Sequence, residues 1–428
     1  MSKVIGMVRT IPAARFAVKR NKYPGNRYRW RVNRRGSTLD GVRRQNLADV
    51  LRHVHRAGRA SRAELTATTG LNRSTVAALV AELEDLGLLV EGDPLATSRV
   101  GRPSPLVTPA AEPVVLAANP EVDAVTVGVV GLSARVDRVI RRPVERIPTP
   151  DDAVEIIADI VEELRAEGAL EGRRMLGAGL AVPGLVRAED HLVRWAPHLG
   201  WRDSRVADLV ADRLGVPCAA GNDATLGAMA EHVFGAGRGI DDLVYLNGGA
   251  SGIGGGVVLG GRIVGGMNGY AGEFGQNKPG LGDSTDRLSP DGVLEDEVSR
   301  RRLLDALGLE HADEAELEHA LLASDDADVL AEVAREQRVL AVALSNAINV
   351  LNPSVVILGG FLAALRAADP QGLEELVRAH ALEAATEGVR IVEAALGGVR
   401  LLIGAAELAL APLLADPARA RGASTSDP

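Results

Sequence analysis

Cysteine and lysine are scarce in this sequence. Cys218 is the single cysteine in 428 residues, so one chain can build neither a disulfide framework nor a thiolate-rich zinc site. Only four lysines accompany the many arginines, which we attribute to genomic composition rather than to chemistry. No apolar run approaches the roughly 18 residues of a membrane span, and the N-terminus lacks the apolar core of a secretory signal. We therefore expect a globular, cytoplasmic protein with no membrane partner.

Acidic residues are scarce at the front of the chain and plentiful behind it. Residues 1–110 hold 20 Lys and Arg against 8 Asp and Glu, a net charge of +12; the whole chain carries −9, so residues 111–428 carry −21. A basic front is attracted to a polyanion such as DNA, because arginine contacts to phosphates release counterions. The alternative is that the excess lies mainly in a disordered tail.

Residues 1–38 are predicted to be such a tail. They contain eleven Lys and Arg, no acidic residue and no helical or strand period. They could hold DNA phosphates, or they could be an upstream extension before the true start codon, since Met7 is also available. We favour the second interpretation slightly.

Residues 39–110 carry the pattern of a winged helix-turn-helix domain. Apolar residues at helical spacing from Leu47 to Val54 predict a first helix that ends near Gly58. A capping-box pattern at 61–64 opens a short second helix, and Gly70 makes the turn to a third. The buried stripe of that third helix is Val76, Leu79, Val80, Leu83 and Leu86. Two strands at 88–90 and 105–108 would form a wing around the arginine loop 99–103.

This arrangement predicts a DNA interface. The start of the third helix would enter the major groove, and the wing would contact a minor groove or the backbone. A three-helix protein-interaction module with the same core is the alternative, but capping box, turn glycine, exposed polar residues and arginine wing occur together, which favours DNA. The predicted DNA-binding residues are Ser61, Arg62, Asn72, Arg73, Ser74, Thr75, Arg99 and Arg102.

Residues 111–428 alternate between strand and helix patterns, which predicts an α/β body of two lobes with a cleft between them. Strands are expected at 124–130, 177–182, 242–246, 253–259 and 354–358, and helices at 151–166, 204–214, 330–350 and 405–414. The last helix is expected to close back on the first lobe.

A short polar turn, GNDAT at 221–225, follows a probable strand and precedes a probable helix. Open α/β sheets bind ligands at the carboxyl ends of their strands, so Asp223 could meet a substrate hydroxyl as a general base or as a hydrogen-bond acceptor. The alternative is that Asn222 and Asp223 only cap the next helix.

Five motifs in the body carry a family resemblance. They are GAGLAVPG at 177–184, APHLGW at 196–201, NDA at 222–224, GEFG at 272–275 and LNPSVVILGG at 351–360. In order and spacing they resemble the ROK family (repressors, open reading frames and sugar kinases), from about Gly41 to Leu414. The match includes the winged helix that distinguishes ROK transcriptional regulators from stand-alone ROK kinases.

The resemblance implies an actin-like, ribonuclease-H-like two-lobed body with a sugar pocket. In the family's kinases, the residue at the Asp223 position takes the proton from the sugar hydroxyl that attacks ATP. We add Gln276, at a family zinc-ligand position, because its amide can contact a sugar hydroxyl. The predicted effector-binding residues are Gly184, Asn222, Asp223, Glu273, Gln276 and Glu295.

Two departures from the family pattern argue against a working kinase with a zinc site. The phosphate loop Asp-x-Gly-x-Thr is replaced by NPEVD at 119–123, where a proline and an extra carboxylate oppose phosphate binding. The zinc ligands are missing, because Gln276 replaces the histidine and residues 286–295 contain no cysteine. No cofactor is therefore expected, neither zinc nor ATP, and Asp223 becomes a vestigial base position.

The sequence thus predicts a DNA-binding transcriptional regulator, most plausibly a repressor, whose degenerate ROK body senses a sugar, sugar phosphate or other sugar derivative. A homodimer, or a higher homo-oligomer, would bind an operator with two half-sites. Two alternatives remain: an active ATP-dependent sugar kinase with a DNA-binding head, and a ligand-independent DNA-binding regulator.

Overall fold

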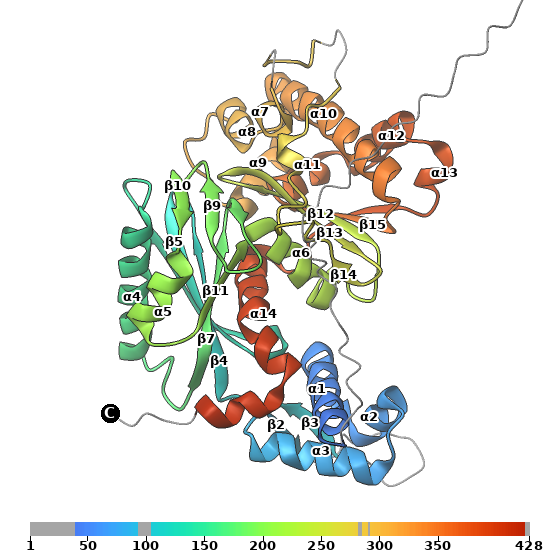
Figure 1. Cartoon of the computed structure of the whole chain (residues 1–428). Coiled ribbons are helices and arrows are strands. Elements are labelled where there is room, and N and C mark those ends of the chain that lie inside the picture. The colour runs from blue at the N-terminus through green and yellow to red at the C-terminus, as the bar shows by residue number, and fades with distance from the viewer. Residues whose placement is uncertain (1–38, 93–103, 281–284, 290–291, 424–428) are drawn as a thin grey trace, which may run out of the picture. The chain divides into compact units, whose positions relative to one another are not determined.

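The computed structural model describes residues 39–92, 104–280, 285–289 and 292–423 (Figure 1). The chain divides into two compact units, Met1–Val42 and Arg43–Pro428, and all the side-chain contacts described below lie in the second unit. The predicted tail at 1–38 and the arginine loop at 99–103 lie outside the described residues, so Arg99 and Arg102 stay predictions.

The winged helix-turn-helix is present as predicted. It consists of α1 (Leu39–Ala57), β1 (Ala60–Ser61), α2 (Arg62–Thr69), α3 (Arg73–Asp85), β2 (Leu89–Gly92) and β3 (Leu106–Pro109), with the strands in the order β1-β3-β2. The predicted apolar stripes of α1 and α3 are buried and form one hydrophobic core. Gly70 ends α2 at a φ of 69°, a left-handed conformation that suits glycine.

The first lobe of the body is built on a five-stranded sheet in the order β11-β7-β4-β5-β6. Its strands are β4 (Pro113–Pro120), β5 (Ala124–Gly131), β6 (Val136–Pro143), β7 (Arg174–Val182) and β11 (Cys218–Asn222). Helices α4 (Pro150–Ala166) and α5 (Val206–Leu214) cover one face, and α14 (Arg400–Ala415) packs on β7 and β4 (Figure 1). A small antiparallel sheet of β8 (Leu185–Val186), β9 (Val193–Ala196) and β10 (Trp201–Ser204) is inserted before α5.

The second lobe contains a second five-stranded sheet, in the order β14-β13-β12-β15-β16. Its strands are β12 (Leu243–Gly249), β13 (Gly252–Leu259), β14 (Arg262–Ile263), β15 (Val355–Gly360) and β16 (Arg390–Glu393). Its helices are α7 (Leu294–Glu297), α8 (Arg300–Ala306), α9 (Glu314–Ala323), α10 (Ala327–Leu351), α11 (Phe361–Ala368), α12 (Pro370–His380) and α13 (Glu383–Thr386). All the strands and helices predicted for the body are present, with their ends shifted by a few residues.

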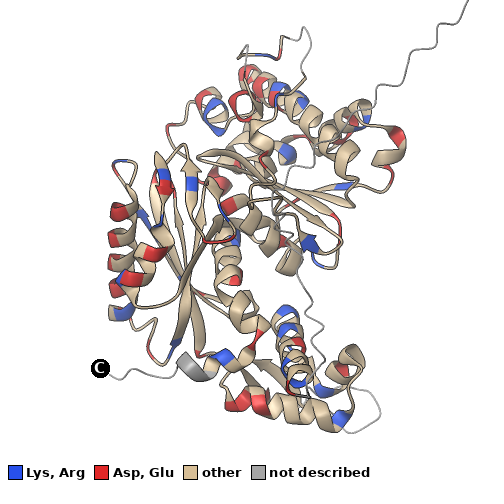
Figure 2. Ribbon diagram, in the orientation of Figure 1, with Lys and Arg blue, Asp and Glu red and all other residues tan. Residues whose placement is uncertain are grey.

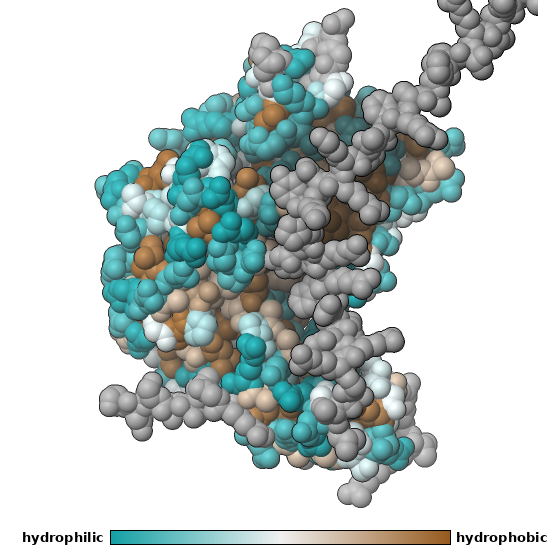
Figure 3. Space-filling view, viewed as in Figure 1, coloured by the Kyte–Doolittle hydropathy of each residue, from teal (hydrophilic) through white to brown (hydrophobic). Residues whose placement is uncertain are grey.

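One helix is long and apolar enough to span a membrane by length and composition, although Arg400 and Glu407 interrupt its apolar residues. This helix comprises residues Gly397–Ala415. Most of it is buried, because α14 packs on the first sheet and on α6 (Asp223–Phe234). Core helices of folded domains have this composition when they are covered on most sides. Hydrophilic residues predominate on the described surface of the face seen in Figure 3.

Candidate effector site and DNA interface

The predicted turn at 221–225 is shorter in the structure than expected. Strand β11 ends at Asn222 and α6 begins at Asp223, with no loop between them. Asn222 caps α6, because its Oδ1 accepts from the Thr225 N–H at 2.8 Å, while its Nδ2 donates to the Gly184 carbonyl at 3.0 Å. The helix-cap interpretation therefore holds for Asn222. The Asp223 Oδ1 accepts from the neighbouring Ala224 N–H at 2.8 Å.

The predicted effector carboxylates form one electrostatic cluster. Burial raises the pKa of Asp223, and burial together with the charges of Asp223 and Glu295 raises the pKa of Glu273 to about 7. Such shifts arise when carboxylates are brought together away from water. They are also frequent at functional sites, because a ligand can supply the hydrogen bonds that the free site lacks.

Glu295 and Gln276 are paired with each other. The Gln276 Nε2 donates to Glu295 Oε1 at 2.6 Å, and the Ile253 N–H donates to Glu295 Oε2 at 3.1 Å. Glycines make room for this carboxylate, because a Cβ at Gly252 or Gly275 would lie 2.4 or 2.7 Å from Glu295 Oε2. The structure thus brings Glu295 and Gln276 together at β13, and Glu273 is linked to them by charge.

The degenerate phosphate loop forms the tight turn between β4 and β5. Asn119 is buried and donates to the Ala181 carbonyl at 3.0 Å, and the Glu121 N–H bonds to the Ala124 carbonyl at 2.8 Å. Burial, followed by the charges of Asp123 and Asp223, raises the pKa of Glu121 to about 7. Glu121 therefore belongs to the acidic cluster, which the sequence analysis did not recognise.

A buried arginine lies at the carboxyl ends of β12 and β15. Arg400, 3% exposed, donates from Nε to Tyr245 Oη at 3.0 Å and to Asn247 Oδ1 at 3.1 Å. Its two other nitrogens hold the Glu314 carboxylate at 2.6 and 2.9 Å. A Cβ at Gly359 would lie 3.2 Å from Arg400 Nε, so this side chain packs directly on the glycine pair 359–360.

An open cavity of about 1790 Å³ lies away from these residues. Its lining includes Leu89, Arg174, Cys218 and Leu413, and none of the predicted effector residues. The case for an effector site therefore depends on the carboxylate cluster, because cavity size alone points elsewhere.

Three of the predicted DNA-binding residues have structural roles in the head. Ser61 caps α2 in a reciprocal box with Glu64, with N–O distances of 3.2 and 2.7 Å. Asn72 caps α3 by accepting from the Thr75 N–H at 2.8 Å. Arg62 forms an ion pair with Glu91 of β2, which joins α2 to the wing. The pairing with Glu91 leaves less of the Arg62 side chain to contact a phosphate.

Arg73 and Ser74 are exposed at the start of α3, and Thr75 is half-buried behind them. Figure 2 shows acidic residues beside basic ones in this domain. Among its described residues, seven arginines are balanced by seven Asp and Glu. The net positive charge of residues 1–110 therefore lies in residues 1–38 and 93–103. This agrees with the alternative that the excess lies mainly in the N-terminal tail.

A buried contact joins α1 to the body. His55, 1% exposed, lies 2.8 Å through Nε2 from Glu407 Oε1 on α14, and its Nδ1 accepts from the Ser133 N–H at 2.9 Å. Because a backbone N–H only donates, Nε2 carries the proton that faces Glu407. The ring of Phe234, the last residue of α6, meets the His55 ring edge to face at 5.3 Å. None of these contacts of His55 was predicted from the sequence.

A winged helix-turn-helix joined to a two-lobed α/β body with a carboxylate cluster defines a DNA-binding transcriptional regulator with a sugar-kinase-like domain. Residues 44–96 match the MarR family model, and residues 125–411 match the model of the ROK family. The chain belongs to the ROK family.

Its relatives include both regulators and kinases. The xylose repressor of Caldicellulosiruptor bescii is 25% identical over 83% of this chain and 93% of its own length. The glucokinase of Streptomyces coelicolor is 32% identical over 35% of this chain and 43% of its own length. A crystal structure of a ROK family transcriptional regulator, a homologue of the E. coli MLC protein, is similar in fold with a TM-score of 0.69 at 21% identity, over 87% of this chain and 97% of that one.

Proposed function

We propose that this protein is a sugar-responsive transcriptional repressor whose ROK body binds a sugar without phosphorylating it. The observation that carries the proposal is the carboxylate cluster of Asp223, Glu273 and Glu295, which Glu121 joins from the former phosphate loop. Carboxylates hold sugar hydroxyls well, because charged acceptors make strong hydrogen bonds. A fourth carboxylate in the phosphate loop repels the γ-phosphate that a kinase must hold. The relatives named xylose repressors favour a pentose as the effector, and those named glucokinases favour a hexose.

Arg400 supports the loss of kinase activity. The ROK resemblance implies that the glycine-rich turn at 247–256 and the glycines at 359–360 correspond to positions that bind the nucleotide in the family's kinases. Here the Arg400 side chain bonds Asn247 and packs on Gly359, and Glu314 neutralises it at 2.6 Å. A nucleotide would have to displace this ion pair, in which Arg400 is buried and Glu314 is half-exposed, and would leave the buried guanidinium without its partner. The proposed sugar-binding body also includes no zinc ion.

Two helices could carry the signal from the sugar to the DNA-binding domain. Helix α6 begins at Asp223 and ends about 18 Å away, by helix geometry, at Phe234, which contacts His55. Helix α14 begins at Arg400 and carries Glu407, which also contacts His55. A sugar that favours one setting of α6 would shift α1 and change DNA affinity, provided that it binds the two states differently. A homodimer would present two copies of α3 to two half-sites.

The proposal is tested with the purified chain and the DNA upstream of its own gene. We expect a specific complex at low salt that D-xylose, D-glucose or a phosphate of either sugar dissociates, measured by fluorescence anisotropy. Thermal shift with the same sugars reports binding independently, because a ligand of the folded state raises its apparent stability. A protein that binds neither its upstream DNA nor any sugar of the panel would refute the proposal.

The 32% identity to the glucokinase of Streptomyces coelicolor favours one second candidate, an active sugar kinase with a DNA-binding head. It predicts ATP turnover with one of these sugars that disappears in Asp223→Asn. No turnover across the panel would remove it.

Replacing His55 should separate sugar binding from the DNA response. His55→Phe removes the bonds to Glu407 and Ser133 but keeps a ring against Phe234. We expect sugar affinity within about twofold of wild type, whereas the sugar-induced change in DNA affinity, typically about 5- to 150-fold in coupled systems, falls to less than about threefold. The control is His53→Gln, on the same helix and half-buried. An unchanged response in a folded His55→Phe protein would exclude this route.

A further inference from the structure

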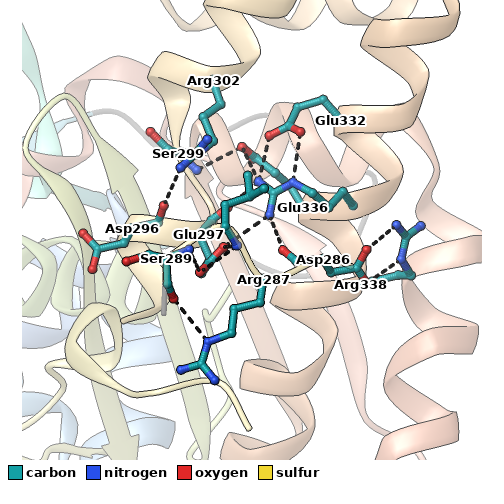
Figure 4. A network of polar contacts seen from close by, with 12 residues as sticks. Asp286, Arg287, Ser289, Asp296, Glu297, Ser299, Arg302, Glu332, Glu336 and Arg338 are labelled. Atoms are coloured by element: carbon teal, nitrogen blue, oxygen red, sulfur yellow. Dashed lines mark hydrogen bonds and ion pairs between the residues drawn. The ribbon is translucent and has the colours of Figure 1, made fainter. Parts of the chain in front are cut away.

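An ion-paired cluster outside the predicted site joins α10 to α7 and to the segment 285–289 before it (Figure 4). It consists of Asp286, Glu297, Arg335 and Arg338, which we call the α10 clamp. Arg335 is 7% exposed and makes contacts in three directions. It donates to the Glu332 carboxylate at 2.9 and 2.7 Å, to the Asp286 carbonyl at 3.0 Å and to the Glu297 carbonyl at 2.6 Å.

Glu297, on α7, also holds the segment 285–289, which contains Asp286. Its side chain is 1% exposed, accepts from the backbone N–H groups of Leu288 at 3.0 Å and Ser289 at 2.8 Å, and lies 3.5 Å from Arg335 Nη1. Arg338 makes a two-pronged contact with the Asp286 carboxylate at 2.8 and 2.7 Å. The segment 285–289 is therefore held through the Asp286 carbonyl, the backbone N–H groups of Leu288 and Ser289, and the Asp286 carboxylate. The forked arginine side chain permits several such contacts at once.

The ROK resemblance implies a zinc ion near this segment, and the residues present do not fit one. The Gln276 amide is turned toward Glu295, and the Asp286 carboxylate is matched by Arg338, whose hydrogen bonds lower the pKa of that carboxyl. Structural zinc needs about four Cys or His donors. Over the described ranges, no group of three or more His, Cys, Asp or Glu side chains could hold a metal ion.

The clamp is connected to the carboxylate cluster through α7. Glu297 and Glu295 lie two residues apart on this short helix, which Leu294 and Val298, both 0% exposed, anchor in the core. Glu295 bonds Gln276 and the Ile253 N–H, while Glu297 bonds the clamped loop. We propose that the α10 clamp takes the place of a metal ion: it fixes α7 and so positions Glu295 and Gln276 to bind the sugar. The sugar-binding part of this inference rests on the proposed function.

The test compares Arg335→Met and Arg335→Lys in the full chain with Arg301→Met, an exposed arginine that pairs with Asp305 on α8. Hydrogen exchange measured by mass spectrometry reports on the backbone at 285–299 and at 250–256, which contains the Ile253 amide. For Arg335→Met we expect exchange to quicken about tenfold or more in both segments, with α1 unchanged, and the Kd for D-xylose, or for D-glucose if that is the sugar bound, to rise about tenfold. Arg335→Lys keeps the charge without the fork and should fall between wild type and Arg335→Met. If Arg335→Met does not fold, exchange and sugar affinity of Arg335→Lys decide whether the clamp positions α7.

Metal analysis completes the test. We expect wild-type protein to contain far less than one zinc per chain, and EDTA to leave both exchange and sugar affinity unchanged. About one zinc per chain whose removal quickens exchange at 285–299 would overturn the proposal, and so would unchanged exchange at 250–256 in both Arg335 variants. If wild-type protein binds no sugar at all, the proposed function fails, whereas exchange and zinc content still decide whether the clamp orders α7.

Discussion

Asp223→Asn is expected to weaken sugar binding at least about 100-fold, which is about 2.8 kcal/mol at 1.4 kcal/mol for each factor of ten. Hydrogen bonds to a charged group contribute about 1.5–3 kcal/mol each, and a sugar presents several hydroxyls. The Asp223 carboxylate accepts from the Ala224 N–H at 2.8 Å and from its own backbone N–H. A sugar hydroxyl would add to these bonds, because a carboxylate offers about four acceptor sites. Isothermal titration with the sugar identified in the binding screen measures the loss.

The same substitution should not destabilise the ligand-free protein. Burial raises the pKa of Asp223, and its charge raises the pKa of Glu273 and Glu121. A neutral amide removes that repulsion, so the melting temperature should stay equal or rise, as expected where a functional site is kept at a cost in stability. The control is Asp212→Asn, which removes an exposed carboxylate from α5. Full sugar affinity in Asp223→Asn would show that the sugar binds elsewhere, and loss of DNA binding in the folded variant would contradict the separation of the two roles.

Local sequence rules predicted the local structure well. The caps at Ser61 and Asn72 and the turn at Gly70 depend on residues a few positions apart, so the chain encodes them directly. The core stripes of α1 and α3 were predicted for the same reason, because helical periodicity needs no knowledge of the partner. The site residues came from the family motifs, and the structure links Glu273, Glu295 and Asp223 by charge.

The contacts that sequence analysis missed join residues far apart in the chain. His55 and Glu407 are 352 positions apart, and Arg335 is 49 from Asp286. No periodicity marks such pairs, because tertiary folding alone brings them together. Glu121 could have been predicted to join the carboxylate cluster, because a carboxylate in the former phosphate loop faces the same site as that loop does in a kinase. Arg62 has a long-range contact of this kind too: its ion pair with Glu91 was not predicted, and its contact with DNA stays a prediction.

Arg73→Glu is expected to reduce operator affinity at least about 100-fold at low salt. Arg73 is the first residue of α3 and is exposed there, next to Ser74. If this end of α3 faces DNA, the substitution replaces an attraction to the phosphates with a repulsion. It should not unfold the domain, because a carboxylate in the first turn of a helix interacts favourably with the helix dipole. The measurement is operator binding by fluorescence anisotropy across a salt series.

The salt series identifies the kind of contact that Arg73 makes. Each phosphate contact adds about 0.9 to the slope of log K against log salt, so Arg73→Ala should lower the slope by about one if the arginine meets a phosphate. If it meets a base edge, Arg73→Ala should instead relax sequence preference at one operator position by about 1–3 kcal/mol with the slope kept. Arg262→Glu, an exposed change on β14 of the body, alters net charge equally and should have little effect. Wild-type affinity in Arg73→Glu would mean that α3 is not the recognition helix, and would leave residues 1–38 and the wing as the basic segments that bind DNA.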